Sequence, residues 1–210
     1  TKSSRSDKIV VRFDNKNLEE PKYAGRLVVI DAGHGGKDPG AISPNLKLNE
    51  KDLTLDTAQR VERLLKEAGF DTYMTRDSDV YVGLSDRANA ANVRNAAVFV
   101  SIHYNAHSNS EIKGIQVLYN GNDPTRDNKT FAQIMMEEMC IGLGAPDKGV
   151  VNRPNLVVIR DTKMPAVLVE VAFLTNPEEE SLVSTAAYRQ KAAQAIVNGI
   201  KRYFDEVLSK

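Results

Sequence analysis

The sequence predicts an α/β fold, a single domain with a mostly parallel sheet of about six strands flanked by helices on both faces. The chain has 210 residues, of which 41% are hydrophobic. That is enough for one good-sized core and too little for two comfortable domains. From residue 25 onward, short β-branched runs alternate with longer amphipathic segments. Such alternation is typical of βα units, whose strands pair in parallel.

Each element has its own signal in the sequence. The strand candidates are short apolar runs rich in β-branched residues: residues 27–31, 71–75, 97–103, 114–119, 156–159 and 166–171. The helix candidates have apolar residues at helical spacing: residues 50–68, 85–92, 131–139, 177–183 and a last helix from residue 185 onward. Asn49 can cap the first helix, and Gly69 can end it in the left-handed conformation. Asn176 followed by Pro177 is a cap with proline at the first helical position.

The charge balance excludes two classes of partner. Twenty-eight basic residues balance 28 acidic ones, so no net charge attracts nucleic acid or an anionic membrane. No apolar run approaches the roughly 20 residues that span a bilayer. We therefore expect no nucleic-acid partner and no membrane span.

The first 24 residues differ from the rest. They contain a polar start, a strand-like run at residues 8–13 and a charged stretch before Pro21. We interpret residues 1–24 as an N-terminal linker or arm, with the end of an upstream region as a further interpretation. Residues 25–210 then form the folded domain.

Three polar side chains stand at or near the ends of apolar strands that do not need them for folding. They are His34, His103 and Glu170, and the chain has only three histidines. The carboxyl ends of parallel strands meet at one edge of a sheet, where open α/β proteins place their sites. Two histidines at neighbouring strand ends favour a shared metal ion, because imidazole is the commonest metal-binding side chain.

Glu50 is the best candidate for a third ligand. The long connection from residue 35 to residue 49 can bring the start of its helix beside His34. Two histidines and a carboxylate with an open fourth position is a catalytic zinc arrangement. A carboxylate in the first turn of a helix also stabilises the helix dipole, so a capping role is the alternative for Glu50.

Glu170 is a candidate for proton transfer. Apolar residues surround it in the sequence, and burial raises the pKa of a carboxyl group, which suits a group that takes up and returns a proton. The alternative is a buried salt bridge to Arg76 or Arg87.

Three further polar groups have interpretations of their own. We interpret His107 as a loop histidine or at most a residue at the rim of the site, with a metal ligand as the alternative. Asp31 either orients a ligand histidine or caps the turn. The two arginines are expected to form structural pairs with Asp77, Asp79 or Asp86.

Four segments together resemble a known family. They are residues 28–41 (VVIDAGHGGKDPGA), 49–51 (NEK), 101–106 (SIHYNA) and 165–176 (PAVLVEVAFLTN). In this order they resemble the zinc-dependent N-acetylmuramoyl-L-alanine amidases of bacterial cell walls, over about residues 26–204. Ala32 and Ala172 replace the proline and glycine that are common in the family, which are small changes.

The resemblance implies roles for four residues. His34, Glu50 and His103 would bind one zinc ion, and Glu170 would be the catalytic glutamate. The implied reaction is hydrolysis of the amide between the lactyl group of N-acetylmuramic acid and L-alanine in peptidoglycan, by a zinc amidase domain over residues 25–210. A zinc peptidase or deacetylase acting on another cell-wall amide is an alternative, as is a cell-wall binding module without catalysis.

The resemblance also implies a setting. The substrate of the family, peptidoglycan, implies that the protein is located in the cell wall or periplasm, or outside the cell as a secreted autolysin. Some members of the family carry a long insertion with a helix that covers the zinc. Here only residues 120–128 separate the strand at 114–119 from the next helical stripe, too few for such a lid. We therefore expect a site that needs no protein activator.

Overall fold

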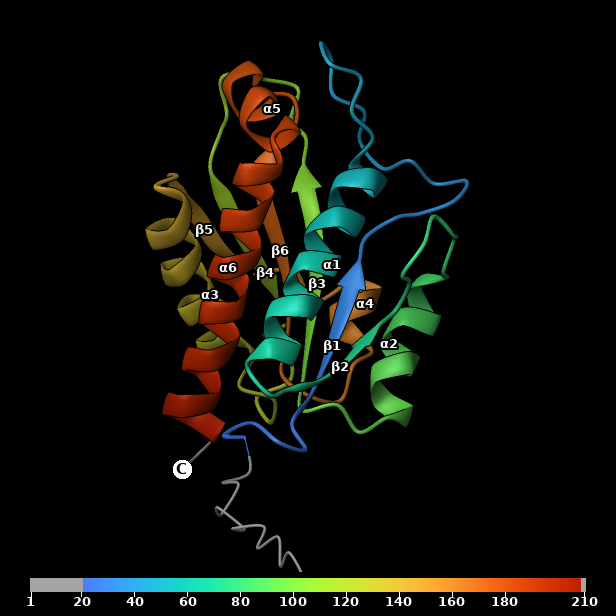
Figure 1. Cartoon of the computed structure of the whole chain (residues 1–210), viewed down its shortest axis with the longest axis vertical. Coiled ribbons are helices and arrows are strands. Elements are labelled where there is room, and N and C mark those ends of the chain that lie inside the picture. The colour runs from blue at the N-terminus through green and yellow to red at the C-terminus, as the bar shows by residue number, and fades with distance from the viewer. Residues whose placement is uncertain (1–20, 209–210) are drawn as a thin grey trace, which may run out of the picture.

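The computed structural model describes residues 21–208, which form a six-stranded sheet between two layers of helices (Figure 1). The strands are β1 (Leu27–Ala32), β2 (Asp71–Met74), β3 (Val98–Asn105), β4 (Ile115–Tyr119), β5 (Asp147–Asn152) and β6 (Ala166–Phe173). Their order across the sheet is β2-β1-β3-β6-β4-β5. Strands β2, β1, β3 and β6 run parallel, whereas β4 runs antiparallel to β6. The predicted α/β class with a mostly parallel sheet is confirmed.

The helices cover both faces of the sheet. They are α1 (Glu50–Glu67), α2 (Leu84–Val93), α3 (Asn128–Leu143), α4 (Val157–Arg160), α5 (Pro177–Ser184) and α6 (Ala186–Tyr203), followed by the π-helical turn η1 (Phe204–Leu208). Helices α1, α3 and α6 pack in one core layer with Ile30 and Val100 of the sheet. Helices α2 and α4 pack on the other face, against Val29 and Phe99. Alternate residues of each strand therefore enter opposite cores, as the pleat requires.

The predicted strand at residues 156–159 is wrong. Val157–Arg160 form the single turn α4, in which the amides of Ile159 and Arg160 donate to the carbonyl of Leu156. A short apolar run fits a buried helical turn as well as a strand. The sixth strand is instead β5, an edge strand that is half-buried or exposed throughout. It has no buried face, so no apolar alternation marks it in the sequence.

The helix caps follow the sequence in part. Asn176 caps α5 as predicted, since its side chain accepts hydrogen bonds from the amides of Glu178 and Glu179. Gly69, with φ of 92°, follows the end of α1 as expected. Asn49 holds the N-cap position of α1 but accepts no capping bond. Its side-chain amide donates to Asp52 instead.

The segment just before β1 packs on the domain. Tyr23 is buried, stacks on Phe70 with ring centroids 4.1 Å apart, and donates a hydrogen bond to Asp205. The strand-like run predicted at residues 8–13, and the predicted arm as far as residue 20, lie outside the described residues. The boundary at residue 24 stays a prediction. Within residues 21–208, no helix is long and apolar enough to cross a membrane.

The two asparagines at N-cap positions, of which only Asn176 makes capping bonds, form a matched test. Asn176→Ala removes two capping bonds and the bond from its side chain to the carbonyl of Ser110. Urea denaturation should therefore show an unfolding free energy lower by about 1–2 kcal/mol. Asn49→Ala removes no capping bond and should change it by less than about 0.5 kcal/mol. Equal losses in the two variants would contradict the assignment of the caps.

Candidate metal centre

The turn after β1 holds His34 in an uncommon conformation. Its φ is 61°, in the left-handed region that non-glycine residues rarely occupy. Two buried arginines hold the turn by its carbonyls. Arg87 donates to the carbonyl of His34 at 2.7 Å, and Arg76 to that of Gly33 at 2.9 Å. These contacts keep the histidine at the sheet edge in spite of the local strain.

Gly33 allows the two site histidines to meet. A Cβ atom at this position would overlap the ring of His103. With glycine there, the rings of His34 and His103 stand edge to face with centroids 4.9 Å apart. The glycine between strand and histidine is therefore required by the close packing of the His103 ring.

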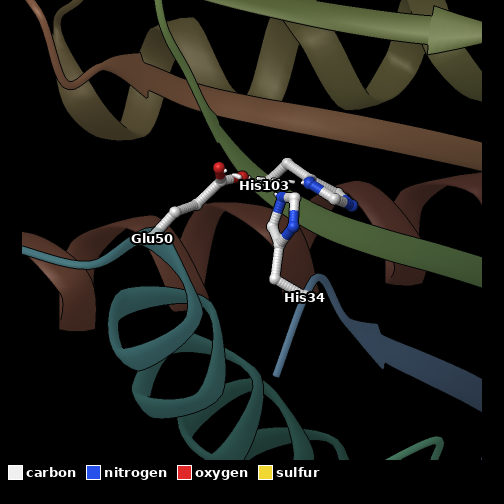
Figure 2. Close-up of side chains that lie close together, drawn as sticks. All are labelled: His34, Glu50 and His103. Atoms are coloured by element: carbon white, nitrogen blue, oxygen red, sulfur yellow. Dashed lines mark hydrogen bonds and ion pairs between the residues drawn. The ribbon is translucent and has the colours of Figure 1, made fainter. Parts of the chain in front are cut away.

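Three side chains from separate elements converge at this edge (Figure 2). The Nε2 atom of His34 lies 3.1 Å from Oε2 of Glu50, and Nδ1 of His103 lies 3.0 Å from Oε1. The possible ligand atoms of the three residues all lie within 4.8 Å of one another. The structure thus brings together the three residues that the sequence predicts as ligands.

The contacts of Glu50 do not support a capping role. Its carboxylate accepts hydrogen bonds from the amides of Ala41 and Tyr104, both outside its own helix. Burial works against its charge, but the hydrogen bonds to His103 and His34 outweigh burial and hold the pKa of Glu50 well below its usual range. A buried, ionised carboxylate therefore lies between two imidazoles.

This donor set fits a divalent cation such as zinc. Two imidazole nitrogens and one carboxylate oxygen are the ligands of known catalytic zinc sites. The side chains of His34 and His103 are 23% and 17% exposed, so the centre can be reached from solvent.

The carboxylate that orients His34 is Asp38. Its Oδ2 atom lies 2.8 Å from Nδ1 of His34. Burial lowers the pKa of His34, but the contacts with Glu50 and then Asp38 raise it to about 9. Sequence reasoning missed this residue. The signal that could have found it is its place four residues after His34, where the chain folds back through the bridge between Gly35 and Asp38.

Asp31, by contrast, neither contacts a histidine ring nor caps the turn. It is fully buried and accepts hydrogen bonds from Thr75, Ser101 and Arg87. Burial opposes its charge, but Arg87 and the two hydroxyls hold the pKa of Asp31 below its ordinary value. Both interpretations made from the sequence are therefore wrong, and the residue is half of a buried ion pair.

The expected pairing of the arginines is also wrong. The carboxylate partner of Arg87 is Asp31, at 2.8 Å. Arg76 donates to backbone carbonyls and to Thr54. Arginine contacts with carbonyls more than 40 residues away leave no pattern in the local sequence.

Glu170 lies beside the centre without an arginine partner. It faces His103 across the register of β3 and β6. Its Oε2 atom is buried and has no hydrogen-bond partner among the described residues. Burial raises the pKa of Glu170 to about 7, although His103 acts in the opposite direction. The alternative of a salt bridge to Arg76 or Arg87 is not what the structure contains.

A family profile described as N-acetylmuramoyl-L-alanine amidase matches residues 28–202. The chain belongs to this amidase family. The match includes all the residues of the centre. Among relatives, the chain is 37% identical to the amidase LytC of Bacillus subtilis over 187 residues, which is 89% of this chain and 37% of LytC. It is 32% identical to AmiC of Neisseria meningitidis, over 88% of this chain and 54% of AmiC. The chain thus spans only part of these relatives.

Solved structures of amidases share the fold. An amidase from Clostridium difficile 630 is 36% identical with a TM-score of 0.83, covering 87% of this chain and 98% of that one. The catalytic domain of CwlV from Bacillus (Paenibacillus) polymyxa is 38% identical with a TM-score of 0.81, covering 86% and 98%. The α/β architecture is therefore that of an amidase catalytic domain.

Within this amidase fold, Glu180 fixes the loop that approaches Glu50. Its buried carboxylate accepts hydrogen bonds from the amides of Asn45 and Leu46. The same loop donates from Ala41 to Glu50. Sequence reasoning missed Glu180, because its partner segment lies 135 residues away.

His107 is a loop residue, as interpreted from the sequence. It is exposed, and its Nδ1 atom accepts a hydrogen bond from the amide of Asn109. It does not belong to the group formed by His34, Glu50 and His103.

The buried pair of Asp31 and Arg87 predicts a pH-dependent stability. Arg87→Met leaves a buried carboxylate without its partner, so the free energy of unfolding at pH 7 should fall by about 3–5 kcal/mol. In the unchanged chain the folded pKa of Asp31 is lowered, so its stabilisation is complete above the unfolded pKa of about 3.9. It is lost as the pH falls through the folded pKa. In the variant, protonation of Asp31 in acid removes its unpaired charge and so reduces the loss of stability.

Urea denaturation of both proteins from pH 7 to pH 4, without metal, measures this difference. The difference in the free energy of unfolding between the two proteins should become smaller as the pH falls. The control is Arg94→Met near the end of the same helix, which removes an exposed guanidinium that stacks on Tyr73 and should cost less than about 1 kcal/mol. A gap that is constant or widens in acid would contradict the account.

Proposed function

We propose that this chain is a zinc-dependent N-acetylmuramoyl-L-alanine amidase of the bacterial cell wall. It hydrolyses the amide that joins the lactyl group of N-acetylmuramic acid to L-alanine in peptidoglycan. The observation that carries the proposal is the convergence of His34, Glu50 and His103 beside Glu170, in a chain of the amidase family. The buried Oε2 atom of Glu170 has no hydrogen-bond partner within residues 21–208.

In this proposal His34, Glu50 and His103 hold one zinc ion. When bound, zinc supplies a Lewis acid that acidifies water and polarises a carbonyl oxygen. Asp38 holds Nδ1 of His34, which fixes the ring and leaves Nε2 for the cation. The amides of Ala41 and Tyr104 hold the carboxylate of Glu50 in place. The site is therefore prepared before any ligand enters.

Glu170 is the proposed proton carrier. Its carboxylate takes a proton from the attacking water while the water oxygen bonds to the lactyl carbonyl carbon. It then gives that proton to the alanine nitrogen as the carbon–nitrogen bond breaks. The products are a lactyl carboxylic acid and a peptide with a free amino terminus. A pKa raised by burial to about 7 supports both halves of this cycle near neutral pH.

The setting follows from the substrate. Peptidoglycan lies outside the cytoplasmic membrane, so we place the protein in the cell wall or periplasm, or as a secreted autolysin. LytH of Staphylococcus aureus, 36% identical over 91% of this chain, carries the description "Probable cell wall amidase".

We also propose that no protein activator is needed. The connection from β4 to α3 spans only residues 120–127, and both histidines keep some exposure. The similar CwlD amidase of Clostridioides difficile, 30% identical with a TM-score of 0.81 over 86% of this chain and 98% of that one, was solved in complex with the GerS lipoprotein. A partner of that kind is thus the alternative. Purified chain that stays inactive until another protein is added would contradict our proposal.

Digestion of purified peptidoglycan tests the proposed reaction. Mass analysis should find free stem peptides with an L-alanine amino terminus and glycan strands with intact lactyl groups. A chelator should stop the release, and added zinc should restore it. Cleavage within the peptide would favour the zinc peptidase, and release of acetate the deacetylase. Retained binding without any cleavage in the presence of zinc would favour the binding module.

Substitutions separate the ligands from the proton carrier. Glu170→Gln should keep about one bound zinc per chain and lower kcat by at least about 10²-fold, because the amide cannot carry a proton. Glu50→Ala, in contrast, should lose both the bound zinc and the activity. Zinc content by mass spectrometry and kcat are measured on the same samples, with His107→Ala as the control that should keep both. Full activity in Glu170→Gln would remove Glu170 from the mechanism.

A further inference from the structure

A cavity of about 300 Å³ opens beside the two histidines, on the face of the sheet that α2 and α4 cover. Its floor includes Asp31, Arg87 and Leu168, and His34 and His103 form part of its wall. Asp38 and Tyr81 also line it. The remaining walls are mainly apolar and come from around the starts of the two helices, with Val82, Leu84, Leu156, Val157 and Val158. The cavity is therefore continuous with the candidate metal centre.

The charged side chains that line the cavity already have partners. Asp31 and Arg87 are paired with each other at 2.8 Å. The remaining donors of Arg87 go to the carbonyls of Val82, Ala32 and His34. Asp38, the other carboxylate of the lining, lies 2.8 Å from Nδ1 of His34. An anionic group that entered would lose its hydration and meet these carboxylates without a free cationic partner, which is costly. The group that fits is therefore uncharged.

The position of the cavity along the sheet edge indicates which half of the substrate it receives. His34 follows β1, His103 lies on β3, and Glu170 lies on β6, in that order across the sheet. Under the proposed function, Glu170 protonates the leaving nitrogen, so the peptide half extends toward the β6 and β4 side. The acyl half then extends toward β1. The cavity includes the turn after β1 and the segment before α2. It reaches Leu168 of β6, but Glu170 is not part of its lining.

We propose that this cavity is the subsite for the N-acetylmuramoyl half of the substrate. The lactyl methyl and acetamido groups of that half are uncharged and suit apolar walls. The stem peptide, in contrast, carries a carboxylate on the residue after alanine. This assignment rests on the proposed function and adds to it the place where the acyl group binds.

The absence of tryptophan from the chain makes a fluorescence test direct. Leu84 lines the cavity and is 56% exposed, so Leu84→Trp places a single tryptophan at its mouth without disturbing the core. Val93→Trp, at the far end of the same helix and 64% exposed, is the matched control. The zinc-loaded proteins are titrated with the N-methylamide of N-acetylmuramic acid and, separately, with the dipeptide L-alanyl-D-glutamate.

The muramoyl amide should give a saturable emission change in Leu84→Trp, and the dipeptide should give none. Val93→Trp should respond to neither. A response of Leu84→Trp to the dipeptide alone, or to neither probe, would overturn the assignment. This experiment measures binding and not cleavage. Failure of the chain to cleave peptidoglycan would therefore refute the proposed function without affecting the binding result, so the two failures can be told apart.

The tryptophan of Leu84→Trp could itself occupy the cavity and block the ligand, so a second variant is tested by kinetics. Leu84→Asp places an unpaired charge at the mouth and should raise KM for N-acetylmuramoyl-dipeptide about tenfold while kcat stays within about twofold. Val93→Asp should leave both constants unchanged. An unchanged KM in Leu84→Asp would contradict the subsite.

Discussion

The carboxylate of Glu50 between His34 and His103 is the contact on which the rest of the site depends. It joins the first turn of α1 to the turn after β1 and to β3. A buried carboxylate needs such partners, because an isolated charge in the interior is strongly destabilising. The same contact brings two nitrogens and an oxygen into the small volume that a divalent cation requires. Both the packing of this edge and the proposed chemistry therefore require these three side chains to lie close together.

Polar side chains around the site stabilise that arrangement through hydrogen bonds to the backbone of neighbouring segments. Arg76 and Arg87 hold the carbonyls of a turn that would otherwise relax from its left-handed conformation. Glu180 holds the loop whose Ala41 contacts Glu50. Each of these side chains is buried and makes hydrogen bonds to backbone atoms. Such bonds fix the position of a segment, so the site is rigid before substrate binds.

The sequence predicts the parts of the fold that have a buried face. Strands β1, β3 and β6 are nearly continuous apolar runs, and their carboxyl ends meet, so His34, His103 and Glu170 could be placed at one edge before any coordinates were known. The edge strand β5 has no such pattern and was missed. Partners far apart in the chain were missed too. For Asp31 the sequence predicts a contact with a ligand histidine or a turn cap, whereas its partner Arg87 is 56 residues away and the orienting carboxylate is Asp38.

The central claim is that His34, Glu50 and His103 share one zinc ion, and anomalous diffraction from crystals grown with equimolar zinc tests it most directly. The account predicts one strong peak at the zinc edge, about 2.0–2.2 Å from Nε2 of His34, Nδ1 of His103 and a carboxylate oxygen of Glu50. A peak that contacts only one of the two histidines, or zinc bound elsewhere while this site stays empty, would contradict it.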